Sequence, residues 1–420
     1  MARDNPFGPL PDGALYCDLT QSWSARGGGV GTYIRRKRRH ILDHSAHRHL
    51  VVIPGRTDRT IVEEGGRAIT VTIASPRVPG SPNYRLLLRN RAVRAAFDAH
   101  RPDLIECQDA YNLPWSAVAY RRRNPATALV AAYCTDFPTV YVERTLAKMV
   151  GAPLAAAASR ISYRYAATLY RRFDAVFAMS ENGGAVKLRS MGVDPVDVVP
   201  LGVELGEFSP GKRCPALRAS LGLADDQPLI IYAGRLDSEK RAETVAEAFL
   251  RLPQSMGAML VLLGEGPTRQ PLTDLLAGKR ALLPGYVRDR SDLARWLASA
   301  DLYASGMANE TFGISVIEAQ ASGLPVVGVA AGAMVDRVTP DIGRVGPVDD
   351  AGAMAQNLID VWHGDHAAMA EASWRHAQQF SWQQSMDALF GELYPRAFHR
   401  AAARAGGMLA AAPRGLVRAG

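Results

Sequence analysis

Apolar residues gather along the chain in short continuous runs, separated by longer stretches in which they recur at helical spacing. The runs occupy residues 14–20, 49–55, 68–74, 103–108, 128–135, 175–180, 229–236, 258–266, 301–306 and 324–329. Runs that are continuously apolar, rather than alternating, are typical of parallel strands covered on both faces. Between them, Glu239–Leu252 and Ser291–Ala300 carry the spacing of amphipathic helices. Repeated units of this kind predict an α/β architecture with parallel sheets.

The length of the chain suggests how these units are divided. A chain of 420 residues exceeds what one hydrophobic core usually supports, which favours two domains of about 200 residues each. Glycines and prolines interrupt regular structure near Val198–Pro210, so we place the link there. We expect an N-terminal domain (1–200), a C-terminal domain (201–379), a helix (380–398) and a flexible tail (399–420), whose Ala, Gly and Arg residues form no clear apolar face.

Composition narrows the class of protein. No apolar run approaches the roughly eighteen residues that a membrane-spanning helix needs, and no basic segment followed by an apolar one marks a secretory signal. The four cysteines form neither a CxxC pair nor a disulfide framework, which suits a reducing compartment. We therefore expect a cytoplasmic protein without structural zinc. A solvated surface, rather than a metal site, is also expected for the histidines beside an arginine run, which are His40, His44, His47 and His49.

Positive charge is concentrated in the first half of the chain. Residues 1–200 contain 28 Lys and Arg against 17 Asp and Glu, whereas residues 201–420 contain 21 against 24. The densest basic run is Arg35–His40, followed by Tyr84–Arg94 and Tyr170–Phe173. Two interpretations stay open, a solvated helix face and a patch for anionic lipid headgroups. Nucleic-acid binding is the least supported interpretation, because no recognition motif accompanies the charge.

A glycine-rich segment, "RGGGVGTY", follows the first apolar run. Gly27, Gly28, Gly29 and Gly31 would let backbone NH groups approach a ligand closely, and a helix beginning near Gly31 would offer its positive end to an anion. The segment matches neither the dinucleotide-binding GxGxxG pattern nor the phosphate-binding GxxxxGK[ST] pattern. Taken alone, it is equally well explained by glycines at a tight turn.

The second half carries a sharper signal. The run at 229–236 ends in "GRLDSEK", which places Arg235 and Lys240 where a phosphate could meet two cations. Further along, "ETFGISVIE" holds two glutamates, Glu310 and Glu318, around Gly313, which could open a helix. An exposed helix face would explain two glutamates. However, Glu318 lies in an apolar segment, and an unpaired buried carboxylate is costly, so ligand contact explains the pair better.

The order of these motifs resembles the retaining glycosyltransferases of family four, which have the GT-B fold. The resemblance runs from about Leu15 to Tyr394 and is carried by "GGGVGTY", "VVPLGVELGEF", "GRLDSEK", "GEGP", "GYV" and the two glutamates followed by "EAQASGLPVV". It implies two Rossmann-like parallel-sheet domains facing each other across a cleft. It also implies that the final helix returns to the N-terminal domain.

The resemblance assigns roles to the candidate site residues. Glu310 would lie near the donor sugar, and Glu318 would accept hydrogen bonds from ribose hydroxyls. The NH groups around Thr311–Ile314 would face a diphosphate that Arg235 and Lys240 neutralise. The implied catalytic residues are Asp136, Glu310, Arg235 and Lys240. The implied donor-binding residues are Gly28, Gly29, Gly31, Arg235, Lys240, Gly285, Val287, Glu310, Thr311, Phe312, Gly313, Ile314 and Glu318.

The resemblance further implies a metal-independent reaction with no cofactor besides the nucleotide-sugar donor, and the sequence contains no DxD motif. The enzyme would move a hexose, such as glucose or mannose, with retention to a hydroxyl acceptor. A lipid or lipid-linked glycan of the cell envelope is the expected acceptor. The enzyme would be cytoplasmic, with peripheral contact with anionic membrane at its inner face. The donor base, the sugar and the acceptor are not specified by the sequence.

One departure from the family pattern concerns residues 133–138, which read "YCTDFP". Many relatives carry a histidine where Cys134 stands, beside the reacting sugar. We expect Asp136 to take over a polar role there and the Cys134 thiol to contribute shape. This substitution is also the basis of the alternative hypothesis, a nucleotide-sugar-binding protein with weak or no transferase activity.

Overall fold

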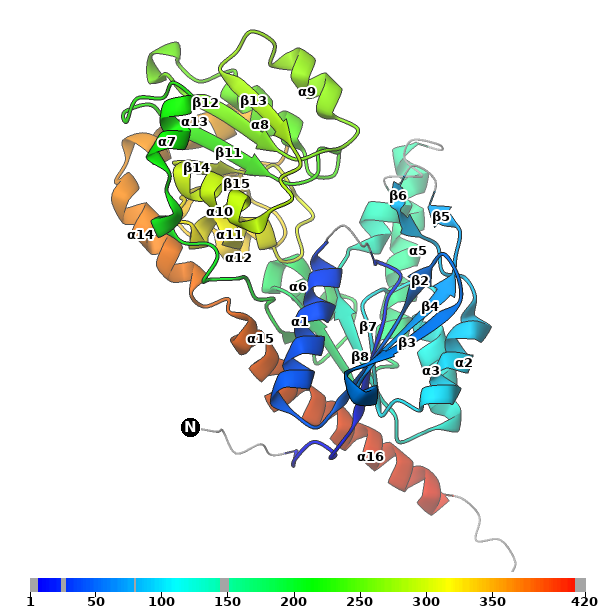
Figure 1. The fold of residues 1–420 in the computed structure, drawn as a ribbon. Helices are drawn as coiled ribbons and strands as arrows, with labels where there is room; N and C mark the ends of the chain where they lie inside the picture. Colours follow the sequence, from blue (N-terminus) through cyan, green and yellow to red (C-terminus); the bar gives the residue numbers. More distant parts are fainter. Residues whose placement is uncertain (1–6, 24–27, 79–80, 144–150, 412–420) are drawn as a thin grey trace, which may run out of the picture. The chain divides into compact units, whose positions relative to one another are not determined.

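Two compact units make up this computed structural model (Figure 1), which describes residues 7–23, 28–78, 81–143 and 151–411. The first unit comprises Met1–Ala178, Leu188–Val199 and Met386–Gly420, and the second comprises Met179–Lys187 and Pro200–Ser385. The division after Val199 falls inside the segment where the sequence places the link. Residues 179–187 cluster with the second unit, which the sequence did not indicate.

The first unit is built on an eight-stranded sheet with strand order β10-β9-β8-β7-β1-β2-β4-β3. Its strands are β1 (Leu15–Leu19), β2 (Arg48–Gly55), β3 (Arg59–Glu63), β4 (Ala68–Ala74), β7 (Leu104–Cys107), β8 (Ala128–Tyr133), β9 (Ala175–Ala178) and β10 (Asp197–Val198). Neighbouring strands run parallel except β3 and β4, which pair antiparallel. The six apolar runs of this half all contain strands, as predicted. The edge strands β3 and β10 were missed, because β3 is mostly exposed and β10 has two residues.

Helices lie on both sides of this sheet, with α1 and α2 on opposite sides in Figure 1. The helices are α1 (Gly29–His44), α2 (Asn90–His100), α3 (Pro114–Arg123), α5 (Ala152–Tyr170) and α16 (Tyr394–Ala411), with short turns at Glu64–Gly66, Pro138–Glu143 and Leu389–Leu393. A small antiparallel ribbon is formed by β5 (Arg77–Val78) and β6 (Ser81–Arg85). The parallel strands and their covering helices form an α/β unit.

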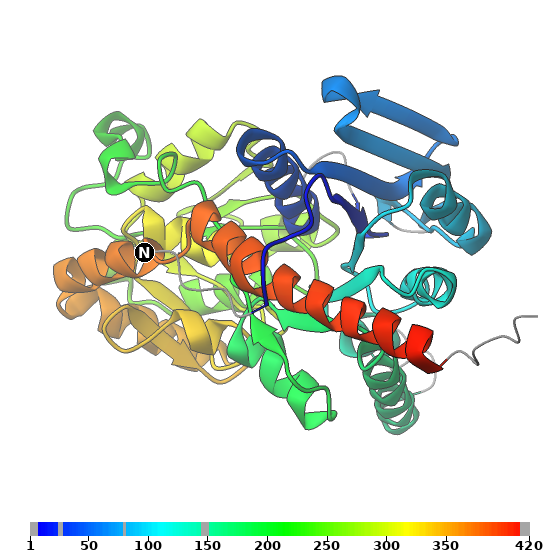
Figure 2. The same ribbon diagram turned by 90° about the horizontal axis from the view of Figure 1, so that it is seen from below.

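The expected tail is wrong as far as residue 411, because α16 continues through Ala411. This helix packs against β8 and β9 and is seen from below in Figure 2. Arg404 donates to the carbonyls of Pro125 (3.0 Å) and Thr127 (3.2 Å) and forms an ion pair with Asp174. These contacts hold a segment whose composition suggested mobility. Residues 412–420 lie outside the described residues.

The basic run at Arg35–His40 lies on α1 and is partly internal. The Lys37 side chain is 2% exposed, and its Nζ lies 2.6 Å from Asp18 Oδ1 and 3.0 Å from Glu106 Oε1. Arg38 donates to the Ile69 carbonyl at 2.7 Å. The exposed cations of the run are Arg35 and Arg39, so only part of the run can serve as a surface patch.

The expectation of a solvated surface is wrong for His49. Instead of lying on a solvated surface, His49 is fully buried on β2. Its Nδ1 accepts from Arg38 Nε at 3.1 Å and its Nε2 lies 2.7 Å from Asp18 Oδ2. Burial lowers the pKa of His49 to about 4, so the ring is neutral near pH 7 and Nε2 donates to Asp18. The tertiary fold, rather than the histidine spacing, sets this environment.

The second unit contains a six-stranded parallel sheet with strand order β13-β12-β11-β14-β15-β16. Its strands are β11 (Leu229–Ala233), β12 (Met259–Leu263), β13 (Ala281–Gly285), β14 (Leu302–Ala304), β15 (Val326–Val329) and β16 (Gly343–Gly346). All four apolar runs of this half contain strands, as predicted. The sequence missed β13, where exposed and half-buried residues alternate, and β16, which begins and ends with glycine.

The helices of the second unit cover this sheet. They are α7 (Pro215–Ser220), α8 (Ala242–Phe249), α9 (Arg269–Leu275), α10 (Arg290–Ser299), α11 (Ile314–Ala321), α12 (Met334–Arg337), α13 (Ala351–His363) and α14 (His366–Ala377), with short turns at Glu181–Ala185, Pro210–Lys212 and Gln254–Met256. Two further helices, α6 (Val186–Ser190) and α15 (Trp382–Ala388), cross the boundaries between the units. Val245 of α8 and Leu358 of α13 belong to one buried core with Ile230 and Leu262 of the sheet.

A helix able to span a membrane is absent from the part of the chain that the structure describes.

Candidate active site

The loop between β14 and α11 carries Glu310 and is held from behind by backbone contacts. The NH of Ala333 donates to the Glu310 carbonyl at 2.8 Å. Gly332 lies so close that a Cβ there would be 2.7 Å from the same carbonyl oxygen. These contacts fix the backbone of Glu310 at the carboxyl end of the sheet, where α/β sheets bind ligands.

Gly313 connects this loop to α11 and has a φ of 87°, a conformation that L side chains rarely adopt. The turn lets the NH groups of Phe312 and Gly313 bond to the Glu310 carboxylate. Lys240 Nζ lies 3.1 Å from Glu310 Oε2. Burial of the Glu310 carboxyl opposes ionisation, but Lys240 and the two NH groups outweigh it and lower the pKa. Glu310 is therefore ionised near neutral pH, beside a cation and a helix N-terminus.

Glu318 lies on α11 and is 4% exposed. Its Oε1 lies 2.7 Å from Arg290 Nη2, at the start of α10. Burial raises the pKa of Glu318, whereas the guanidinium of Arg290 lowers it, and the net shift is upward. The sequence identified Glu318 as a candidate but gave no signal for its partner, because Arg290 is one of several arginines in an exposed segment.

Arg235 and Lys240 follow β11 but have different surroundings. Lys240 contacts Glu310, as described above. The Arg235 side chain is 57% exposed, and its guanidinium pairs with Asp237 and, at 2.9 Å, with Glu239 Oε2. The structure thus brings Lys240 to the loop between β14 and α11 that carries Glu310, here called the glutamate loop, while Arg235 pairs with carboxylates of its own loop.

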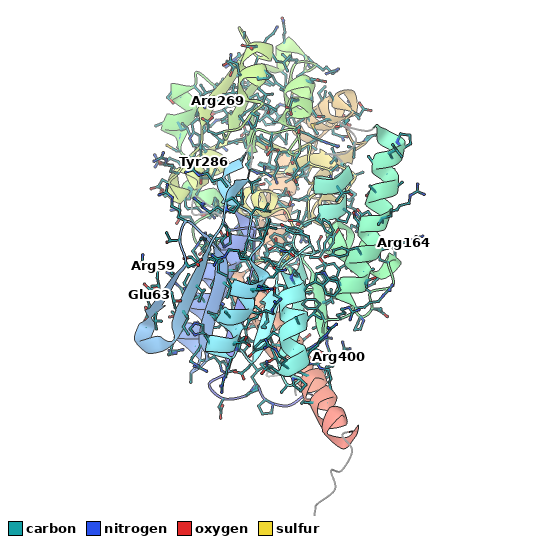
Figure 3. All side chains as sticks on the ribbon, turned by 90° about the vertical axis from the view of Figure 1, so that its right-hand side faces the viewer. Arg59, Glu63, Arg164, Arg269, Tyr286 and Arg400 are labelled. Atoms are coloured by element: carbon teal, nitrogen blue, oxygen red, sulfur yellow. The ribbon has the colours of Figure 1, made fainter. Side chains whose placement is uncertain are left out.

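The turn "GEGP" packs against the strand end that carries Arg235. A Cβ on Gly264 would lie 1.8 Å from the Gly234 carbonyl oxygen, so only glycine fits there. The NH of Gly264 donates to the Gly285 carbonyl at 2.9 Å, which joins the ends of β12 and β13. After Gly285, the side chain of Tyr286 is 58% exposed (Figure 3), and that of Val287 is half-buried.

Residues 179–187 support the glutamate loop, although the sequence did not predict it. Ser180 Oγ donates to the Thr311 carbonyl at 2.9 Å. A Cβ on Gly183 would lie 2.6 Å from that carbonyl oxygen. A serine followed by paired glycines after a strand is the only signal that could have pointed to this role.

Arg337 is a second support that the sequence missed. Its Nε donates to the Phe312 carbonyl at 3.0 Å, and its Cζ lies 4.7 Å from the centre of the Phe312 ring. The residue is 5% exposed, and burial lowers its pKa to about 10, so it remains cationic near pH 7. Arg337 therefore adds positive charge behind the N-terminus of α11.

The glycine-rich candidates belong to the first unit. Gly28 precedes α1 with a φ of 114°, and its carbonyl accepts from the Thr32 NH at 3.1 Å. Gly29 and Gly31 lie in the first turn of the helix, which begins close to the predicted position. The role proposed for Gly27 lies outside the described residues.

Asp136 and Cys134, also in the first unit, follow β8. Asp136 is 4% exposed, and its two carboxylate oxygens lie 2.8 and 2.9 Å from the Tyr163 hydroxyl, which donates to it. Burial raises the pKa of the Cys134 thiol well above its usual value. The sulfur is therefore a protonated thiol near neutral pH rather than a thiolate nucleophile.

Candidate metal ligands do not gather among the residues that the structure describes, since no group of three His, Cys, Asp or Glu side chains is arranged to hold an ion.

Comparison with known proteins identifies the family. The family model described as "Glycosyltransferase Family 4" matches residues 27–207, and the one described as "Glycosyl transferases group 1" matches residues 215–376. A Mycobacterium tuberculosis protein, GDP-mannose-dependent alpha-(1-6)-phosphatidylinositol dimannoside mannosyltransferase, is 26% identical over 88% of this chain and 93% of its own. GDP-mannose-dependent alpha-mannosyltransferase from Corynebacterium glutamicum is 28% identical over 87% of this chain and 85% of its own.

A solved structure gives the fold independently. Sucrose-phosphate synthase from Thermosynechococcus elongatus matches 95% of this chain and 100% of its own, with a TM-score of 0.69 at 19% identity. The two family models match successive parts of the chain, residues 27–207 and 215–376, which together make up most of its length. The chain therefore belongs to the group 1 glycosyltransferases and has the GT-B fold.

Proposed function

We propose that this glycosyltransferase moves a hexose, with mannose the first candidate, from a nucleotide-diphosphate sugar to a hydroxyl acceptor with retention. The observation that carries the proposal is the pair Glu310 and Glu318 on either side of the α11 N-terminus, with Lys240 bonded to Glu310. The names of two relatives, which describe alpha-mannosyl transfer from GDP-mannose, support mannose as the sugar.

In this proposal the nucleotide diphosphate lies against the N-terminus of α11. NH groups of the segment Thr311–Ile314 and the helix dipole favour an anion there, and Lys240 supplies a cation. Arg235 is exposed enough to turn from its present carboxylate partners toward a phosphate. Glu318 accepts hydrogen bonds from the ribose hydroxyls, which anchors the nucleotide end.

Charge on the diphosphate grows as the glycosidic bond breaks, so these donors stabilise the transition state more than the bound donor. With this set of cations and NH groups, we propose that the reaction needs neither a metal ion nor a further cofactor. Glu310, held ionised by Lys240, lies where it can orient the sugar and favour positive charge developing on it. The acceptor's proton would pass to the departing phosphate oxygen on the same face, which gives retention.

The surroundings of Cys134 and Asp136 support transfer without a covalent enzyme intermediate. The thiol is protonated near neutral pH, which makes it a poor nucleophile. Both oxygens of Asp136 accept from Tyr163, which favours a role in shaping or polarising the site. The alternative hypothesis of an inactive binding protein depended on Cys134 alone, and no observation favours it.

A lipid or lipid-linked glycan is the acceptor that we propose, with the protein at the cytoplasmic face of the membrane. One face of α5 supports this, since Leu154 and Ile161 are 63% and 66% exposed. Arg160 and Arg164 are exposed on the same helix, and Figure 3 shows Arg164 on the side facing away from the sheet. Exposed apolar and basic side chains together suit an anionic lipid surface. No nucleic-acid partner is proposed.

A donor screen tests this function. Purified protein is incubated with GDP-mannose, GDP-glucose, UDP-glucose or ADP-glucose, each with extracted lipids or soluble glycans, and products are identified by their added hexose mass. We expect a hexosylated lipid with one donor dominant. Hexosylation of soluble glycans alone would contradict the lipid acceptor. Absence of any hexose product from all four donors would contradict the proposed reaction.

A further inference from the structure

Glu318 has one oxygen paired and one oxygen open. Oε1 is bonded to Arg290, whereas no donor in the described part of the chain bonds Oε2. The residue as a whole is 4% exposed, but Oε2 is not fully buried, so a group that approaches from solvent can reach it. An open acceptor of this kind, on a side chain that Arg290 holds through the other oxygen, is placed to bond a ligand hydroxyl.

Arg290 is itself held in place from two sides. It begins α10, whose preceding residue Asp289 caps the helix by accepting from the NH of Ser291 at 2.7 Å. Its guanidinium carbon lies 4.7 Å from the centre of the Phe208 ring. With one edge on Glu318 and its flat face on Phe208, the guanidinium has a defined orientation although the side chain is 50% exposed.

We propose that Arg290 is a positioning residue for the donor nucleotide: its guanidinium holds the Glu318 carboxylate turned so that Oε2 accepts the ribose hydroxyls. The inference rests on the proposed function, because it takes a nucleotide as the ligand. Arg290 acts through Glu318 rather than by contact with the reacting atoms. The ring of Phe208 limits the guanidinium to the orientation that leaves Oε2 open.

The charged groups around Glu318 show how loss of Arg290 would change the pKa of the Glu318 carboxyl. Burial raises the pKa of Glu318 and the nearby Glu204 raises it further, while Arg290 is the cation that lowers it. Tyr303, which also faces Glu318, has a raised pKa and is neutral. Without Arg290 the pKa of Glu318 would rise further. The protonated carboxyl accepts fewer hydrogen bonds than the carboxylate, so nucleotide affinity would fall as the pH falls.

The experiment compares Arg290→Gln with Arg290→Lys and with the matched control Arg295→Gln. Arg295 lies on the same helix, is 50% exposed and pairs with Asp292 rather than Glu318. Calorimetry measures affinity for GDP, for UDP and for the 2′,3′-dideoxy form of the tighter ligand, between about pH 5.5 and about pH 8.5, the range in which a raised carboxyl pKa would appear. Thermal melting of every variant shows whether it is folded.

We expect wild type and Arg295→Gln to share one pH profile and to prefer the ribose form over the dideoxy form. Arg290→Lys keeps the charge but lacks the flat face that lies on Phe208, so it should fall between these two proteins and Arg290→Gln. Arg290→Gln should weaken binding of the ribose form by about tenfold at pH 7, the scale of a lost charge-assisted hydrogen bond. Its affinity should recover as the pH rises, and its preference for ribose should shrink.

Two results would overturn the inference in different ways. If Arg290→Gln keeps the ribose preference and pH profile of Arg295→Gln, Arg290 does not position Glu318, while the donor site stands. If wild type binds neither GDP nor UDP, the proposed donor site itself is wrong and the inference fails with it. Should Arg290→Gln melt at a much lower temperature than wild type, Arg290→Met is measured in its place against the same criteria.

Discussion

At the scale of single residues, the proposed donor site combines two carboxyl groups whose pKa values are shifted in opposite directions. Glu310 has a lowered pKa because Lys240 and two backbone NH groups outweigh its burial. Glu318 has a raised pKa because burial outweighs one guanidinium. The first carboxylate is already satisfied, whereas the second retains an open oxygen. We therefore expect substitutions at Glu318 and at Lys240, the partner of Glu310, to differ in whether they change nucleotide affinity or turnover.

Replacing Glu318 by alanine should weaken binding of a nucleoside diphosphate by about 1–3 kcal/mol, because ribose hydroxyls lose their acceptor. Lys240→Ala should lower turnover more than nucleotide binding, because its charge is needed most as the leaving group departs. Calorimetric titration and initial rates separate the two effects. Unchanged nucleotide affinity in Glu318→Ala would remove the ribose assignment.

The two residues after β8 give a second prediction. Cys134→Ser should retain most of the turnover, since the half-buried thiol is protonated and contributes shape. Asp136→Asn should lose about 10²-fold or more in turnover, because the site loses the negative charge that we propose polarises it. Steady-state rates at saturating donor measure both, after each variant is shown to bind nucleotide normally. A large loss in Cys134→Ser alone would argue for thiol chemistry instead.

At the scale of secondary-structure elements, α1 joins the sheet of the first unit through buried charges. Lys37 Nζ contacts Asp18 of β1 and Glu106 of β7. The hydroxyl of Tyr394 on α16 donates to Glu106 Oε2 at 2.6 Å and accepts from Lys37 at 3.1 Å. One cation thus links two helices and two strands of the unit.

Lys37→Met should therefore destabilise the first unit strongly, by about 3–5 kcal/mol, because two carboxylates would be left buried without their cation. The exposed Arg39 on the same helix is the control, and Arg39→Met should stay within about 0.5 kcal/mol of wild type. Urea unfolding measures both variants. Adding Asp18→Asn and Glu106→Gln to Lys37→Met should restore part of the loss. Equal stability of the two single variants would contradict the buried network.

At the scale of the whole molecule, the sequence predicted what depends on local pattern. All ten apolar runs contain strands, and the GT-B fold followed from the motif order. Lys37 and His49 were misjudged, because whether a basic residue of a helix or strand is buried depends on partners far away in sequence. Arg290 was missed for the same reason. The sequence ended the last helix too early, because the Ala and Arg residues after Phe398 show no apolar face and the ion pair of Arg404 with Asp174 depends on the tertiary fold.

The exposed apolar and basic side chains of α5 predict that the protein binds anionic membranes, where a lipid acceptor would lie. Binding to vesicles with anionic lipid should exceed binding to neutral vesicles and weaken with salt, because charge attraction is screened. Replacing both Leu154 and Ile161 by aspartate should abolish the difference, whereas the same change at the exposed Val62 of β3 should not. Co-sedimentation measures each case. Negligible binding of wild type to both kinds of vesicle would favour a soluble acceptor.

The central claim is that cations and NH groups around Glu310 and Glu318 support metal-independent transfer with retention. NMR of the first turnovers, with the best donor and excess EDTA, tests it most directly, because the one-bond coupling between C1 and H1 of the new linkage reports its configuration, for mannose as well as for glucose. We predict a product with the donor's anomeric configuration, formed at the same rate with and without EDTA. A product of inverted configuration, or transfer that stops in EDTA and resumes with added Mg²⁺ or Mn²⁺, would contradict the account.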